Sequence, residues 1–362
     1  MKSRRNKIFI VTECPYSGIL RAIIHQATIL KQMNFQVCFV IPIKARDRYG
    51  ERQDENEVLL KKLGTIFHVQ LRRKYRYLLS DKAQFKNFFI NKKNCVVLSY
   101  TGYAGKICRL LFRDGVIKTL YHVPQCIDLL RRSYWQKIIE RRFENFLSPH
   151  CTGYLACGPE ECFALANEYK VDSAKIIFMP NFLSKNYWQK RFLKKKQFVV
   201  LGRVSKDKKV ENVLFAASIL GLLKYFCIIG DGDELVILKK RYPEATFLGR
   251  VTNAEAGKIL RHSRFFISAS IIEGMPFSLL EAMSYGVVPL VSDVPGHRDV
   301  IINGYNGFLF SGNNELADFI FKLHVMADTD YYEQISSHCR VTVQNMATYS
   351  IATLKNNFSQ YE

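Results

Sequence analysis

Two glutamates with seven residues between them are the most specific chemical feature of the sequence. Glu273 and Glu281 lie in the segment 268–283, which is typical of a strand end, a tight turn at Gly274 and a helix beginning near Pro276. The amides of such a turn and the positive end of the helix form a site for an anion or a hydroxyl group at the carboxyl edge of a sheet. A carboxylate at each end of the turn could then accept hydrogen bonds from ligand hydroxyls.

The elements that must position these carboxylates follow the pattern of parallel α/β units, in which apolar strands alternate with amphipathic helices. In the first half the sequence predicts strands at 8–11, 36–41, 96–99, 119–122 and 153–156 and a helix at 20–33. In the second half it predicts strands at 198–202, 225–229, 245–248, 265–269 and 288–291, with a closing helix at 344–361.

The length of 362 residues suits two domains. We expect a first domain at 1–183, a basic linker at 184–197 and a second domain at 198–343. The helix at 344–362 is expected to pack back toward the first domain.

These features together resemble the retaining glycosyltransferases of family 4, strongly over about 198–310 and loosely before it. The resemblance implies the GT-B fold, with two Rossmann-like α/β domains that face each other across a cleft. It also implies that Glu273, with Gly274, Met275 and Pro276, holds the donor sugar, and that Glu281 binds the ribose hydroxyls.

The cations of the second domain resemble the Gly-Arg and Lys-Gly segments of the family, whose Arg and Lys neutralise the donor diphosphate. Gly202 and Arg203 match the first segment, so Arg203 is one expected phosphate ligand. Counting back from the following helix favours Lys209 as the other, while Val210 in place of the usual Gly leaves Lys208 open. Cations held there would stabilise the charge that grows on the leaving phosphate.

Four further positions match the family. Gly230 resembles the Gly-rich turn after the next strand, and backbone near Val251 resembles a contact to the nucleotide base. Gly18 lies where the family has a loop close to the transferring sugar. His122, at the end of a predicted strand, matches a histidine that lies against the donor sugar.

The implied activity is transfer of a sugar, with retention at its anomeric carbon, from a nucleotide-sugar donor to an acceptor. No cofactor and no metal ion is expected, although Asp231 and Asp233 could be read as a metal site. Three alternatives stay open: a nucleotide-sugar epimerase or phosphorylase of the same fold, a basic nucleic-acid-binding protein, and an inactive assembly partner.

The net charge of +21 is unevenly distributed, because residues 1–196 hold 37 Lys and Arg against 15 Asp and Glu. Such an excess indicates a polyanionic partner for the first domain. Basic and aromatic residues interleave at 71–79, which includes Arg72, Arg73, Lys74 and Arg76, and again at 131–143. Both segments suit an anionic membrane surface, and a solvated helix face with core aromatics behind it stays open as the alternative. The absence of a recognition motif argues against nucleic acid.

We therefore expect a glycan or lipid-linked acceptor and a role in bacterial surface polysaccharide synthesis, of O-antigen or capsule. The sequence contains neither a long apolar run nor a signal-peptide pattern, and its ten cysteines lack zinc spacing. The expected location is cytoplasmic, peripheral at the inner face of the cytoplasmic membrane.

Overall fold

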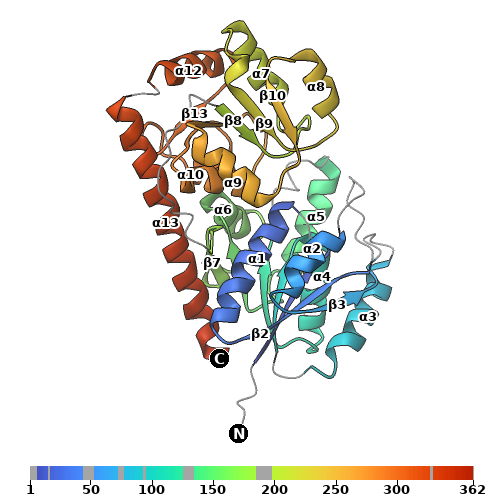
Figure 1. Cartoon of the computed structure of the whole chain (residues 1–362). Coiled ribbons are helices and arrows are strands. Elements are labelled where there is room, and N and C mark those ends of the chain that lie inside the picture. Colours follow the sequence, from blue (N-terminus) through green and yellow to red (C-terminus); the bar gives the residue numbers. More distant parts are fainter. Residues whose placement is uncertain are drawn as a thin grey trace. The chain divides into compact units, whose positions relative to one another are not determined.

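The computed structural model describes residues 6–14, 17–43, 53–71, 77–92, 95–124, 134–184, 198–326 and 329–361. The chain divides into two compact units, Met1–Ser184 with Tyr349–Glu362, and Lys185–Thr348. Each unit is built on a parallel sheet whose strands alternate with helices (Figure 1). The expected class of two Rossmann-like α/β domains is confirmed. Of the expected linker, 184–197, residues 185–197 lie outside the described residues.

The sheet of the first unit has the strand order β3-β2-β1-β4-β5-β6-β7, with every neighbouring pair parallel. Its elements are β1 (Lys7–Thr12), α1 (Ser17–Gln32), β2 (Gln36–Pro42), α2 (Gln53–Lys61), β3 (Thr65–Val69), α3 (Leu78–Phe89), β4 (Cys95–Tyr100), α4 (Gly102–Arg113), β5 (Thr119–Val123), α5 (Tyr134–Leu147), β6 (Gly153–Ala156), α6 (Pro159–Asn167), a 3₁₀ turn at Ser173–Lys175 and β7 (Ile176–Phe178). The central strands are buried on both faces, which explains their continuous apolar runs.

The sheet of the second unit has the order β10-β9-β8-β11-β12-β13. Its elements are β8 (Phe198–Leu201), α7 (Val210–Ile219), a 3₁₀ turn at Leu223–Tyr225, β9 (Phe226–Ile229), α8 (Leu235–Arg241), β10 (Thr246–Gly249), α9 (Asn253–His262), β11 (Phe265–Ser268), α10 (Phe277–Ser284), β12 (Val288–Ser292), α11 (Pro295–Arg298), β13 (Phe308–Phe310) and α12 (Asn313–Met326). Phe198 is in register with Phe226 and Phe265, and its ring stacks on both. The centre of the Phe198 ring lies 4.7 Å from that of Phe226 and 5.1 Å from that of Phe265. This stack fixes the centre of the sheet.

The last helix, α13 (Asp330–Phe358), begins 14 residues before the predicted closing helix and is followed by a 3₁₀ turn at Ser359–Tyr361. Its buried stripe starts at Tyr332, Ile335 and Cys339, so the helix already packs in its first turns. Residues from Tyr349 onward belong to the first unit. There Ser350 donates a hydrogen bond of 2.8 Å to the Pro180 carbonyl, and the Phe358 ring lies 4.7 Å from the Tyr121 ring.

Candidate functional site

The candidate site of the second unit lies where the order of its strands reverses. β8 pairs with β9 on one side and with β11 on the other, so the loops that follow β8 and β11 leave the same edge of the sheet side by side. Ile271 N–H donates to the Asp207 carbonyl at 3.0 Å and joins the two loops. In open α/β sheets this reversal point is where ligands bind.

The two loops bring a predicted cation and a predicted carboxylate together. The Lys208 ammonium forms an ion pair and hydrogen bond with Glu273 Oε1, and Ser270 Oγ donates to the same oxygen at 2.7 Å. Both charged side chains are only partly buried. Arg203 is exposed on the loop that also carries Lys208. The site therefore offers cations and a carboxylate at one edge of one sheet.

Lys209 has a different setting from Lys208. It is exposed and precedes α7 with φ of +48° and ψ of +38°, which is left-handed backbone. Glycine adopts this conformation without steric cost, whereas a residue with Cβ is disfavoured there. Lys209 thus occupies the backbone position that suits the glycine of a Lys-Gly pair, with Lys208 in the position of the lysine.

Gly202 and Gly230 allow the turns after β8 and β9 to pack closely. Their φ angles are +151° and +143°, and a Cβ on Gly230 would lie 1.7 Å from the Gly202 carbonyl oxygen. A larger residue at 230 would displace the loop that carries Arg203. The predicted contact of Gly230 with a donor stays a prediction.

A set of hydrogen bonds behind Glu273 was not predicted from the sequence. Ser292 Oγ donates to the Ser270 carbonyl at 2.5 Å, and His297 Nδ1 lies 2.8 Å from the Ser292 carbonyl oxygen. Burial lowers the pKa of His297, an effect that the nearby Glu273 carboxylate opposes. A Cβ on Gly296 would lie 1.2 Å from the Gly274 carbonyl oxygen, so α11 is seated directly against the Glu273 turn.

The other expected donor residues of this unit surround the same turn. Met275 is buried, Pro276 is the N-cap of α10, and Glu281 is half-buried one turn further along that helix. The positive end of α10 therefore follows the Glu273 turn directly. Val251 is half-buried just before α9, in the turn after β10.

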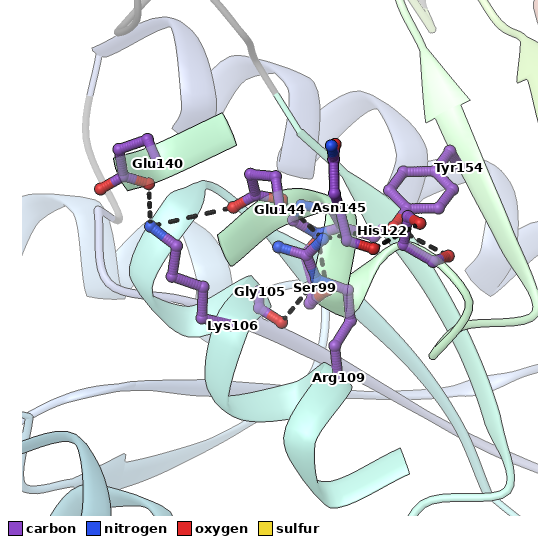
Figure 2. Close-up of polar contacts among 10 residues, drawn as sticks. Ser99, Gly105, Lys106, Arg109, His122, Glu140, Glu144, Asn145 and Tyr154 are labelled. Atoms are coloured by element: carbon purple, nitrogen blue, oxygen red, sulfur yellow. Dashed lines mark hydrogen bonds and ion pairs between the residues drawn. The ribbon is translucent and has the colours of Figure 1, made fainter. Parts of the chain in front are cut away.

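In the first unit Gly18 is exposed in the first turn of α1, with open space around its Cα. His122, near the end of β5, is almost fully buried, and its Nδ1 lies 3.0 Å from Ser99 Oγ (Figure 2). Its ring rests on α4, where a Cβ on Gly105 would lie 2.1 Å from the imidazole Cε1. Contacts of Gly18 and His122 with a donor sugar stay predictions.

His122 should make the fold sensitive to acid. Burial, with Arg109 adding to it, lowers the His122 pKa well below its usual range. Below about pH 6.5 the unfolded chain then binds more protons than the folded chain, so stability falls as pH falls. We expect His122→Asn to reduce this loss of unfolding free energy by up to about 1.4 kcal/mol per pH unit. Urea unfolding of the variant and the parent at about pH 7.5 and about pH 5.5 measures the difference.

The exposed His262→Asn serves as the control for that measurement. If the free energy of unfolding depends on pH equally in His122→Asn and the parent, the imidazole of His122 is not held buried and neutral.

Glu13 is another residue that the sequence analysis missed. It follows β1 directly, is buried, and accepts hydrogen bonds from Tyr103 N–H at 3.0 Å and Ala104 N–H at 2.9 Å, at the start of α4. Thr101, just before that helix, has φ of +71°, which is unusual for a β-branched residue. A carboxylate directly after the first predicted strand was the signal that could have identified Glu13.

The sequence of the second unit matches a known protein family. Residues 185–336 match the family described as Glycosyl transferases group 1. The chain is a glycosyltransferase.

Relatives of this glycosyltransferase include the UDP-Gal:alpha-D-GlcNAc-diphosphoundecaprenol alpha-1,3-galactosyltransferase of Escherichia coli. The two are 26% identical over 276 residues, which cover 68% of this chain and 69% of that protein. The O-antigen chain mannosyltransferase RfbU of Salmonella typhimurium is 22% identical over 218 residues, 54% of this chain and 62% of the relative.

Solved structures show the same fold over the whole chain. Anabaena Alr3699/HepE in complex with UDP matches with a TM-score of 0.76 at 13% identity, covering 98% of both chains. The lipopolysaccharide outer core galactosyltransferase WaaB matches with a TM-score of 0.71 at 17% identity, over 98% of this glycosyltransferase and 99% of WaaB. The expected GT-B class is confirmed. Across the described ranges no helix is long and apolar enough to cross a membrane.

Proposed function

We propose that this glycosyltransferase moves a hexosyl group from a nucleoside diphosphate sugar to a lipid-linked glycan, with retention at the anomeric carbon and without a metal ion. The observation that carries the proposal is the ion pair of Lys208 with Glu273 where the second sheet reverses its strand order. It joins a cation suited to a phosphate with a carboxylate suited to sugar hydroxyls.

The reaction breaks the bond between the sugar and the diphosphate, and negative charge grows on the departing phosphate oxygen. Arg203 and Lys208 would stabilise that charge. We assign this role to Lys208 in preference to Lys209, on the backbone conformation of the pair. The acceptor hydroxyl would attack from the face that the diphosphate leaves, and a diphosphate oxygen would take its proton.

The carboxylates would hold the donor at both ends. Among the described residues, the hydrogen bonds to Glu273 from Lys208 and Ser270 both reach Oε1, which leaves Oε2 to meet a hydroxyl of the sugar. Glu281 on α10 would accept hydrogen bonds from the ribose. Alr3699/HepE has been solved with UDP and with UDP-glucose, which supports uridine diphosphate sugars as the first donors to test.

The acceptor class rests on charge and on relatives. Residues 1–196 carry the basic excess, and the E. coli relative is named for an acceptor sugar on diphosphoundecaprenol. A polyprenyl diphosphate glycan in O-antigen or capsule synthesis fits both. We propose that the enzyme works at the inner face of the cytoplasmic membrane. Residues 72–76 of the predicted basic segment 71–79, which include Arg72, Arg73, Lys74 and Arg76, lie outside the described residues.

Incubation of the enzyme with labelled nucleotide sugars and a lipid diphosphate acceptor tests the proposal. Label should enter the lipid fraction with an α-configured linkage from an α-configured donor. Conversion of the nucleotide sugar without an acceptor would indicate an epimerase, and release of a sugar phosphate would indicate a phosphorylase.

A donor present at about 100 times its Kd should add about 2.7 kcal/mol to the free energy of unfolding. A screen of nucleotide sugars for a raised melting temperature would therefore identify the donor.

Chelation should leave transfer unchanged, because Arg203 and Lys208 would supply the positive charge that a divalent ion supplies in other transferases. Initial rates with and without EDTA, after dialysis against chelator, measure this. Loss of activity with EDTA and its return with magnesium or manganese would show that side-chain cations do not suffice.

A further inference from the structure

Buried ion pairs fix the orientation of α5 in the first unit. Lys106 and Arg109 on α4 are buried, and they bind the two carboxylates of α5 (Figure 2). Lys106 Nζ lies 2.5 Å from Glu140 Oε2, and Arg109 Nη1 lies 2.7 Å from Glu144 Oε2. Since removing one partner of a buried pair is strongly destabilising, these contacts hold α5 with its carboxylates inward.

The opposite face of α5 is exposed and apolar. Trp135, Ile139 and Phe146 expose 72%, 67% and 47% of their surface, and Arg142 is also exposed. The spacing of 135, 139, 142 and 146 places all four on one side of a helix that is about 21 Å long. Single exposed apolar side chains are common on protein surfaces, whereas three large ones in one row form a contiguous patch of the kind that marks an interaction surface.

Two exposed cations, Arg142 and Arg113, lie within or beside this row. Arg113 is exposed and its guanidinium lies 5.1 Å from the centre of the Phe146 ring. Lys137 and Arg141 lie on other sides of the same helix, and Arg141 pairs with Glu168 at 2.9 Å. Because Glu140 and Glu144 point to α4, the exposed row of α5 itself contains only apolar and cationic side chains.

We infer that α5 lies in the plane of an anionic lipid surface, with Trp135, Ile139 and Phe146 inserted among the acyl chains and Arg113 and Arg142 at the headgroups. Apolar burial together with attraction to anionic headgroups is how an amphipathic helix binds a bilayer interface. The cations that flank the row match anionic lipid in charge, which favours a lipid surface over a neutral protein partner. The inference rests on the proposed membrane-linked acceptor, and it names the surface that reaches the membrane.

Trp135 can report its own insertion, because the chain has only one other tryptophan, Trp188. In full-length Trp188→Phe, emission from Trp135 should shift to shorter wavelength when phosphatidylcholine vesicles containing phosphatidylglycerol are added. Brominated acyl chains should quench it. Vesicles of phosphatidylcholine alone should bind at least tenfold more weakly, and added salt should weaken binding to the anionic vesicles.

A double variant, Ile139→Ser with Phe146→Ser, keeps the fluorophore and should weaken binding to anionic vesicles at least tenfold. The matched control is Val236→Ser with Ile237→Ser on α8 of the second unit, where the two side chains are 78% and 59% exposed. That control should bind like the parent. Circular dichroism should show both double variants folded, because the exposed side chains contribute little to the core.

Three results would overturn the inference: an unshifted Trp135 spectrum when the protein sediments with vesicles, equal binding of the α5 double variant and the parent, or binding to native membranes without binding to pure lipid. The first would assign attachment to another basic segment, and the last would assign α5 to a protein partner. The vesicle assays contain no nucleotide-sugar donor, so they test membrane binding alone. Sugar transfer to a short soluble acceptor is measured separately and tests the proposed function alone.

Discussion

Replacing Lys208 with alanine should lower kcat by about 10²–10³-fold, corresponding to about 2.7–4 kcal/mol of transition-state stabilisation. The Lys208 ammonium already lies at Glu273 at the sheet edge, where the leaving phosphate would gain charge. A cation that acts on developing charge contributes more in the transition state than in the ground state, so kcat should fall more than donor affinity. Single-turnover transfer and donor binding by calorimetry separate the two.

The adjacent Lys209 provides the matched control, since the two residues have the same side chain and differ in backbone conformation. Lys209→Gly should retain kcat within about threefold and should not destabilise the fold, because glycine suits the left-handed backbone at this position. If Lys209→Gly loses as much activity as Lys208→Ala, the assignment of the phosphate ligand reverts to Lys209, as the sequence spacing favoured.

Glu273→Gln should lower kcat/KM by at least about 10²-fold. The substitution preserves shape but removes the charge that Lys208 and Ser270 contact, and it weakens hydrogen bonds to the sugar in the transition state. Arg203→Ala should lower transfer at least about tenfold, because it would remove the second cation proposed to stabilise the leaving phosphate. Initial rates over a range of donor concentrations measure both variants.

The control for Glu273→Gln is Glu244→Gln, which removes the charge of an exposed glutamate in the same unit. It should transfer sugar like the parent. Folded Glu273→Gln and Arg203→Ala with near-normal turnover would place the donor chemistry outside the loops after β8 and β11.

The central strands could be predicted because parallel strands buried on both faces need continuous apolar runs. β6 matches its predicted bounds, β8 and β11 differ from theirs by one residue at one end, and β1 and β4 are one residue longer than predicted at each end. The strands β3, β7 and β13 were missed, and all three lie at the edges of their sheets. Their side chains are largely half-buried or exposed, so they lack the continuous apolar pattern.

The sequence by itself determined which loops carry the candidate donor residues, since the order of Arg203, Lys208, Glu273 and Glu281 along the chain is itself the signal. Only the tertiary structure decided which side chains meet. Lys208 and Glu273 are 65 residues apart and come together because β8 pairs with β11, while the left-handed backbone of Lys209 distinguishes it from its neighbour.

The outward row of α5 was likewise decided by tertiary structure. The sequence marked 131–143 as basic and aromatic, but an amphipathic pattern alone leaves open which side of the helix packs inward. Lys106 and Arg109 on α4 settle this by drawing Glu140 and Glu144 into the first unit. Contacts of this kind join separate elements, so local periodicity does not record them, and they decide the direction in which each side chain points.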